Sequence, residues 1–192
     1  MDRGAWIFWA LIAVLVGASV FFIRGTTQQR REARASAAKL ESGEVVSLSE
    51  VVDGDTLLVR TAAEEKVTVR LLGVKAFDTK LEKDITKTYG QAAVDKLRLW
   101  LEGKPARVLL HSTPKDKYGR VIATLFVDEH DVGLELVKEG LALAYTVYPF
   151  PTMQIYLKEQ ELARADRRGL WGNPDAVVRA DALATEWRKQ AP

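Results

Sequence analysis

Residues 45–74 read VVSLSEVVDGDTLLVRTAAEEKVTVRLLGV, and this stretch decides the fold. Two apolar runs flank Asp53-Gly54, a pair typical of a β-hairpin, because glycine adopts the positive φ of a tight turn without steric cost. After a second turn, apolar and polar side chains alternate, as in a strand with one buried face. The pattern predicts three consecutive strands, at 45–52, 56–60 and 66–72.

A polar loop at 75–90 leads into a region where helical and strand patterns alternate. Gly103, Gly140 and Gly169 each follow an apolar stripe of helical spacing, the usual place for a helix to end. We expect helices at 91–102, 133–139 and 152–168, two further strands at 106–111 and 121–127, a short strand at 141–145, and a final helix from Asn173-Pro174. The order predicts an α+β fold, with a five-stranded barrel of the OB (oligonucleotide/oligosaccharide-binding) type packed with helices.

The composition excludes several classes of chemistry. The chain has no cysteine and two histidines, His111 and His130, which removes disulfides, thiol nucleophiles and cysteine zinc sites. It also lacks the G-x-S-x-G, P-loop and G-x-G-x-x-G motifs. Residues 44–192 carry 22 Lys/Arg and 23 Asp/Glu, so their net charge does not indicate binding of duplex nucleic acid. A local basic patch is still compatible with this composition.

An apolar segment at 5–23 predicts one N-terminal transmembrane helix. As a helix it rises roughly 28 Å, close to the hydrocarbon thickness of a bilayer. Trp6 and Trp9 lie near one end, where indole favours the headgroup region. A cleaved signal peptide is the alternative, but the apolar run is longer than a usual signal core and no small-x-small site follows it promptly. We therefore expect a single-pass membrane protein in contact with the lipid bilayer.

Residues 24–43 are expected to form a basic juxtamembrane stalk. Arg24, Arg30, Arg31, Arg34 and Lys39 follow the apolar segment. The positive-inside rule then favours the cytoplasmic side for the globular domain. An extracytoplasmic domain stays open, because large domains cross membranes largely regardless of flanking charge.

Four short strings occur in order along the globular region: VDGDT at 52–56, RLLGV at 70–74, DKYGR at 116–120 and GLW at 169–171. Each alone is typical of a turn or of a helix end, so the signal lies in their order and spacing. Together they resemble the staphylococcal nuclease (thermonuclease) family over about residues 44–172. The resemblance leaves out the apolar segment, the stalk and a C-terminal extension helix at 173–192.

The resemblance implies hydrolysis of phosphodiesters. Two guanidiniums can neutralise a phosphate that gains negative charge, and a hard cation held by carboxylates helps further. In the family's pattern Arg70 and Arg120 form the phosphate clamp, and Asp55 binds calcium. Asp53 organises the loop around Asp55, and Asp78 stands where the family places the glutamate near the attacking water. Tyr118 belongs to the binding residues, together with Asp53 and Lys75.

The loop after the third strand departs from that pattern. The family reads Asp, Thr or Ala, Pro, Glu, whereas this chain reads Lys75-Ala76-Phe77-Asp78. An ammonium replaces a calcium carboxylate, and like unit charges about 4 Å apart repel by roughly 4 kcal/mol at an effective dielectric near 20. We expect Lys75 to pair with Asp55 and to substitute for the ion, which gives a degenerate metal site. Two alternatives are a solvent-facing Lys75 with Asp78 or Asp84 as ligand, and purely structural salt bridges at Arg70 and Arg120.

The final helix carries an apolar stripe that includes Val177, Leu183 and Trp187. Such a stripe either packs on its own domain or forms an interaction surface for a partner. These features favour a membrane-anchored, catalytically degenerate domain that acts as a binding or assembly module without a cofactor, with a protein partner in a membrane complex. The alternative is a calcium-dependent phosphodiesterase on DNA or RNA. A third interpretation is binding of single-stranded nucleic acid or phosphate without cleavage.

Overall fold

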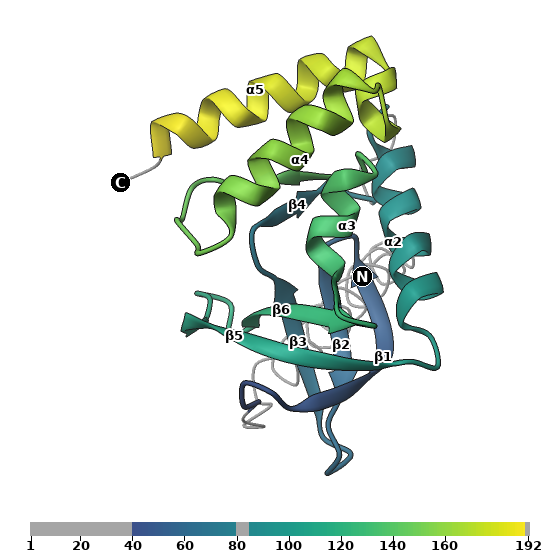
Figure 1. Ribbon diagram of the computed structural model, residues 1–192, viewed down its shortest axis with the longest axis vertical. Coiled ribbons are helices and arrows are strands. Elements are labelled where there is room, and N and C mark those ends of the chain that lie inside the picture. Colours follow the sequence, from purple (N-terminus) through teal and green to yellow (C-terminus); the bar gives the residue numbers. More distant parts are fainter. Residues whose placement is uncertain (1–39, 80–84, 191–192) are drawn as a thin grey trace, which may run out of the picture. The chain divides into compact units, whose positions relative to one another are not determined.

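Five strands close into a barrel in the computed structural model, which describes residues 40–79 and 85–190. The neighbouring strands run in the order β3-β2-β1-β5-β6, and a parallel pairing of β3 with β6 closes the ring (Figure 1). These strands are β1 (Val45–Asp53), β2 (Thr56–Arg60), β3 (Lys66–Leu71), β5 (Pro105–Lys115) and β6 (Val121–Val127). The predicted α+β fold with a five-stranded barrel is therefore confirmed. The predicted N-terminal helix lies outside the described residues.

Helices cover one end and one side of this barrel (Figure 1). Helix α2 packs against β1, and α3, α4 and α5 gather beyond the barrel. Their bounds are α2 Lys87–Leu101, α3 Val132–Lys138, α4 Met153–Ala165, the 3₁₀ turn η1 Gly169–Gly172 and α5 Pro174–Gln190. Helix α2 begins four residues before the predicted start, because Gly90 lies in its first turn, where a glycine signals a loop in sequence.

A short ladder divides the interior into two cores. It pairs β4 (Val74–Ala76) with β8 (Ala142–Ala144), and a further two-residue strand, β7 (His130–Asp131), extends the main sheet. One face of the ladder packs into the barrel core, through residues such as Val74 and Ala144. The other face meets a second core that contains Leu143 and residues of α4, η1 and α5. Three-residue strands are too short to show a period, so the sequence indicated no strand at β4.

Gly54 is required because a larger side chain would not fit at this position. This corrects the expectation from sequence, which was that the turn needs the positive φ that glycine allows. Its φ is not positive, so the turn does not depend on the left-handed region. A Cβ at this position would lie 2.6 Å from the Cβ of Ala76 and 2.9 Å from the Cβ of Ala93. The turn between β1 and β2 therefore holds β4 and α2 at close approach.

The described part of the chain, residues 40–79 and 85–190, contains no helix long and apolar enough to cross a bilayer. The apolar segment at 5–23 and most of the stalk lie outside it.

We predict that Gly54→Ala lowers the free energy of unfolding by about 1–3 kcal/mol, the usual cost of overpacking. Urea denaturation measures it. Gly103→Ala is the control, because Gly103 has a φ of 71° and nothing within 4 Å of an added Cβ, so it tests backbone strain of about 1 kcal/mol without crowding. Equal stability of the wild type and Gly54→Ala would contradict the close approach.

Candidate functional site

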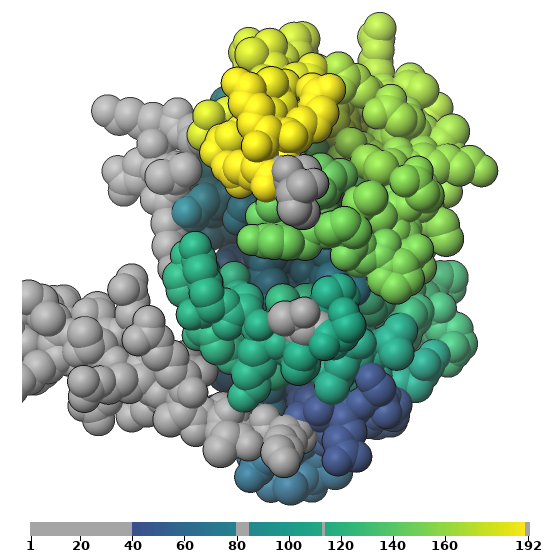
Figure 2. All heavy atoms as spheres, turned by 90° about the vertical axis from the view of Figure 1, so that its left-hand side faces the viewer, coloured from purple at the N-terminus to yellow at the C-terminus, as the bar shows by residue number. Residues whose placement is uncertain are grey.

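Three of the four sequence strings meet in one place. The Asp53–Thr56 turn joins β1 to β2, and Thr56 lies opposite Arg70 in the register of β2 with β3. Arg120 precedes β6, and its Nη1 donates to Oγ1 of Thr56 at 3.1 Å. Figure 2 shows a hollow in the surface. The β5–β6 hairpin lies on one side of it, α5 and residues 145–152 lie on the other, and blue atoms of the β1–β4 region are visible at its floor. We call this hollow the cleft.

Asp55 is the buried centre of the site, with 2 % of its surface exposed. Its Oδ2 lies 3.1 Å from Nη2 of Arg70 and accepts the backbone N–H of Ala76 at 3.0 Å. Its Oδ1 accepts the Thr56 hydroxyl at 3.1 Å. The backbone N–H of Asp55 donates to Oδ1 of Asp53 at 3.0 Å, so Asp53 holds the turn. Both oxygens of the central carboxylate are therefore engaged by the protein.

Lys75 contributes a second cation to the same oxygen. Its Nζ lies 3.5 Å from Oδ2 of Asp55, the arrangement expected from the sequence. Because side chains alternate along β4, Lys75 points to the opposite face from its buried neighbours Val74 and Ala76. The lysine side chain is 46 % exposed, so the buried carboxylate has one ion-pair partner that is in contact with solvent.

The two carboxyl groups of the turn have opposite pKa shifts. Burial alone raises the pKa of Asp55, but the charges of Arg70 and then Lys75 outweigh burial, and the net pKa lies below its ordinary value of 3.8. Burial, and then the charge of Asp55, raise the pKa of Asp53. As the pH falls, Asp53 therefore takes up a proton before Asp55, which stays ionised between its two cations.

The guanidinium of Arg70 donates hydrogen bonds to backbone oxygens within the protein. Nη1 donates to the backbone oxygens of Asp55 at 3.2 Å and Leu71 at 3.0 Å. Nη2 donates to the Val74 oxygen at 2.6 Å and faces Oδ2 of Asp55. A guanidinium has five N–H donors, four of them on the two Nη atoms. Three of these four donate to backbone oxygens, and Nη2 also forms an ion pair with Asp55, so most of the guanidinium is engaged within the protein.

Arg120 lies on a loop that Asp116 organises. Oδ1 of Asp116 accepts the backbone N–H groups of Tyr118 at 2.9 Å and Arg120 at 3.0 Å, and Oδ2 accepts Nε of Arg120 at 2.7 Å. The Tyr118 ring lies 5.5 Å from the guanidinium and 5.1 Å from Nζ of Lys117. The loop thus presents two cations and one exposed aromatic ring together.

The remaining sequence candidates include one exposed carboxyl group and residues of the second core. Asp78 is exposed on the segment that follows β4. Phe77 is buried in the second core together with Trp171 of the GLW string, so that string has a structural role. Asp84 lies outside the described residues. Trp187 is 7 % exposed in the second core, with Val177 and Leu183 half-buried against it, which places the stripe on its own domain.

Two aromatic residues near the site were missed from sequence. Tyr145 follows β8, and its backbone N–H donates to the Gly73 oxygen at 2.8 Å. Burial, and then the neighbouring Tyr148, raise the pKa of this tyrosine, while the charges of Arg70 and Lys117 oppose that shift. The exposed ring of Tyr148 lies 6.4 Å from the Tyr145 ring. A pair of tyrosines after a short apolar strand was the signal available, but strand periodicity does not show which way such rings point.

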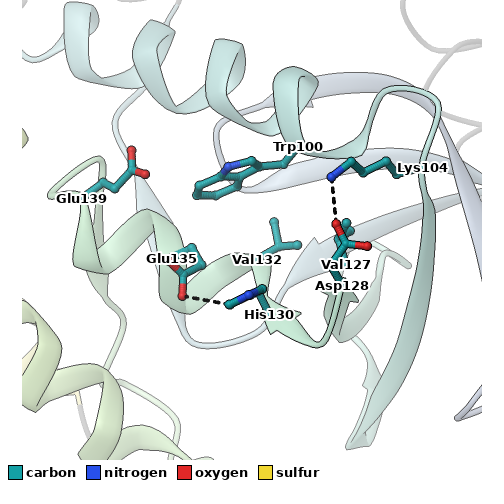
Figure 3. Close-up of a pocket in the computed structure, with 8 residues that line it drawn as sticks. All are labelled: Trp100, Lys104, Val127, Asp128, His130, Val132, Glu135 and Glu139. Atoms are coloured by element: carbon teal, nitrogen blue, oxygen red, sulfur yellow. Dashed lines mark hydrogen bonds and ion pairs between the residues drawn. The ribbon is translucent and has the colours of Figure 1, made fainter.

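A separate pocket of about 260 Å³ lies between α2 and the β6–β7–α3 segment (Figure 3). The Trp100 indole faces it, together with carboxylates that are already paired. Glu139 binds Lys96 at 2.7 Å, Glu135 binds Lys138 at 2.7 Å and Asp128 binds Lys104 at 2.8 Å. The pocket shares no lining residue with the cleft. Among the residues that the structure describes, no three His, Asp or Glu side chains gather as they would to hold a metal ion.

Comparison with known proteins assigns the family. The staphylococcal nuclease homologue family matches residues 68–173. An uncharacterized endonuclease of Haemophilus influenzae is 31 % identical over 140 residues, which cover 73 % of this chain and 70 % of that protein. The thermonuclease of Staphylococcus intermedius is 30 % identical over 130 residues, 67 % of this chain and 77 % of that protein. Endonuclease YncB of Bacillus subtilis is 36 % identical over 137 residues, 69 % and 64 % of the two chains. The chain belongs to the staphylococcal nuclease family.

We predict that Asp55→Asn lowers the free energy of unfolding by about 3–5 kcal/mol at pH 7, because it leaves the buried Arg70 without its counter-charge. The folded-state pKa of Asp55 is depressed, so this stabilisation is present above pH 4 and is lost in the wild type only as the pH falls through the lowered value. Urea denaturation between pH 7 and pH 3 measures both effects.

The controls for Asp55→Asn differ in burial. Lys75→Ala removes a half-exposed partner and should cost no more than about 1 kcal/mol. Asp128→Asn breaks a surface ion pair with Lys104 and should leave stability unchanged within error. A loss in Asp128→Asn as large as that in Asp55→Asn would contradict the central role of the buried carboxylate.

Proposed function

We propose that this chain is a catalytically degenerate staphylococcal-nuclease-family domain that binds phosphate-bearing single strands without cleaving them, and that residues 5–23 tether it to a membrane. One observation carries the proposal: Nζ of Lys75 lies 3.5 Å from Oδ2 of Asp55, the carboxylate that the family's pattern gives to calcium. An internal ion pair thus takes the role of the metal in neutralising the buried carboxylate.

Calcium does not fit these residues. The ion requires six to eight oxygen ligands at about 2.3–2.6 Å and compensating negative charge. Asp55 offers two oxygens, and both already accept hydrogen bonds or face cations. Inserting a divalent cation next to Lys75 and Arg70 would also add repulsion of several kcal/mol at short range. We infer that the neutral Asp55–Lys75 pair is the resting state of the site.

Hydrolysis also requires a general base, and the candidate for this role, Asp78, departs from the family's pattern. The attack of water on a phosphodiester needs a base near the water and positive charge on the phosphate oxygens. Asp78 is one methylene shorter than the glutamate of the family's pattern and is exposed on the segment after β4. Arg70 donates three hydrogen bonds to backbone oxygens and pairs with Asp55, so little of it is left for a phosphate. The residues therefore support binding better than they support turnover.

The cleft still suits an anionic strand. Arg120 and Lys117 supply positive charge, and the exposed rings of Tyr118 and Tyr148 offer stacking surfaces. Stacking on aromatic side chains together with backbone charge is the general way in which proteins hold single strands. The near-neutral domain charge then restricts binding to this local patch.

The second candidate is a calcium-dependent nuclease. It is favoured by the assembly of Asp55, Arg70 and Arg120 in one place and by the names of the relatives, which are thermonucleases and endonucleases. A protein partner in a membrane complex also remains a proposal, although Trp187 is buried and offers it no surface.

We predict that the full-length chain binds a 5′-phosphorylated single-stranded DNA with equal affinity in EDTA and in millimolar calcium, and yields no cleavage products on a denaturing gel. Arg120→Ala should weaken binding roughly tenfold or more, the cost of one charged hydrogen bond. Calcium should not raise the melting temperature, because a ligand stabilises only through its affinity for the folded state. Calcium-dependent cleavage by the unmodified chain would restore the nuclease candidate.

The variant Lys75→Asp tests the same argument in the reverse direction. Without metal it should be less stable than the wild type, because two carboxylates then face each other. Millimolar calcium should restore its melting temperature, while Lys75→Ala should show no such recovery, since it supplies no ligand. Combining Lys75→Asp with Arg120→Ala should keep calcium binding and prevent any gained cleavage.

We predict that deleting residues 1–27 moves the protein from the membrane pellet to the supernatant after an alkaline wash. Replacing Arg30, Arg31 and Arg34 by Gln should leave the protein in the pellet, because the apolar segment supplies most of the insertion energy. Retention of the deleted chain in the pellet would refute the tether. Reporters fused to the C-terminus, each active on one side only, determine the orientation.

A further inference from the structure

We propose that Trp187, on helix α5, is a positioning residue of the cleft, because it holds the Tyr145 ring beside the Arg70 and Arg120 motifs. Helix α5 begins at Pro174, directly after the segment that matches the family. The inference deepens the proposed function and rests on it, since it concerns the ligand cleft defined there.

The β4–β8 ladder shows why Tyr145 lies on the side of α5. Lys75 is opposite Leu143 in the antiparallel register, and opposed residues project from the same face. Side chains two residues apart also share a face, so Tyr145 continues the face of Leu143. That face packs into the second core, which includes Trp187. Leu143 and Tyr145 therefore both pack with the second core, to which α5 contributes Trp187.

The contact between the two aromatic rings is direct. The Tyr145 and Trp187 centroids lie 5.0 Å apart with an interplanar angle of 81°, the edge-to-face arrangement that aromatic pairs favour. Trp187 is buried, whereas Tyr145 is half-buried. The buried indole thus packs against a ring that is itself only half-buried.

Helix α5 is held in place by two sets of contacts in the turns that precede Trp187. Asn173 caps its first turn through hydrogen bonds from the N–H groups of Asp175 and Ala176, at 3.0 and 3.3 Å. Further along, Asp181 accepts two hydrogen bonds from Arg164 of α4, at 2.6 and 2.9 Å. A bidentate pair fixes orientation as well as distance. The position of Trp187 is therefore defined by contacts other than its own ring.

The supported ring lies where a ligand would pass. The backbone N–H of Tyr145 donates to the Gly73 oxygen at 2.8 Å, which places the tyrosine directly beside the Arg70–Val74 motif. Figure 2 shows the end of α5 and the 145–152 segment on one side of the cleft, facing the β5–β6 hairpin. A Tyr145 ring without support could turn into the space left by Trp187, away from the Arg70–Val74 motif. Loss of Trp187 should then weaken ligand binding, although Trp187 itself does not touch the ligand.

The test uses the full-length chain in detergent, with a 3′-fluorescein, 5′-phosphorylated oligothymidine as the probe. Trp187→Ala should weaken binding by roughly threefold to tenfold, the range for one aromatic contact. Trp187→Phe should restore most of the affinity because it keeps an aromatic edge. Tyr145→Ala should weaken binding as well, and adding Trp187→Ala to it should have no further effect, because the two residues act as one unit.

Leu183→Ala is the matched control, since Leu183 lies on the same helix and packs half-buried against the same core. It should lower the melting temperature and leave the affinity unchanged. The position of the Tyr145 ring can also be followed without ligand, by the NMR signal of its ¹³C-labelled ring. The signal is assigned through its absence from the spectrum of Tyr145→Phe. This signal should shift in Trp187→Ala and stay in place in Leu183→Ala.

Three outcomes are separable. Weaker binding by Trp187→Ala, rescued by Trp187→Phe and absent in Leu183→Ala, supports the inference. Probe binding by the wild type with unchanged affinity in Trp187→Ala, or additive losses in the double variant, overturns the inference and leaves the proposed function standing. No probe binding by the wild type refutes the proposed function, and the positioning role falls with it.

Discussion

The buried carboxylate of Asp55 is the constraint on which the site and much of the surrounding structure depend. A charge with 2 % exposure is unfavourable unless cations and donors surround it. Arg70, Lys75, Thr56 and the Ala76 backbone supply these partners from three strands. Because the partners come from β2, β3 and β4, satisfying one carboxylate fixes how these strands meet.

The same constraint explains the close packing around the turn. The Asp55 carboxylate reaches the N–H of Ala76 only if β4 lies against the β1–β2 turn, and Gly54 leaves room for that approach. Once β4 is held there, its pairing with β8 divides the interior into two cores. The second core then receives Phe77 from the loop after β4 and Trp187 from α5. The C-terminal extension is in this way connected to the site through packing.

An internal ion pair and a bound metal neutralise a buried carboxylate in different ways. A metal leaves coordination positions for a phosphate and for water, whereas a lysine supplies charge with no such positions. In this member of the staphylococcal nuclease family the guanidinium of Arg70 also turns its Nη donors toward the protein. Asp55, Arg70, Lys75, Thr56 and Arg120 thus form one cluster of ion pairs and hydrogen bonds at the centre of the site.

Hydrophobic periodicity and turn residues are local signals, so they were enough to predict the barrel strands, the order of the helices and the site motifs. The end of α4 was predicted wrongly, because the helix stops at Ala165 and Gly169 begins a separate 3₁₀ turn. The sequence also indicated that Lys75 would meet Asp55, since a family pattern placed both at one site. The membrane segment at 5–23 stays a sequence prediction. Tertiary structure alone decided the role of Gly54, the β4–β8 ladder, the donor use of Arg70 and the contact of Tyr145 with Trp187. Each of these depends on which distant segments come within a few ångströms, and a local pattern carries no record of such an approach.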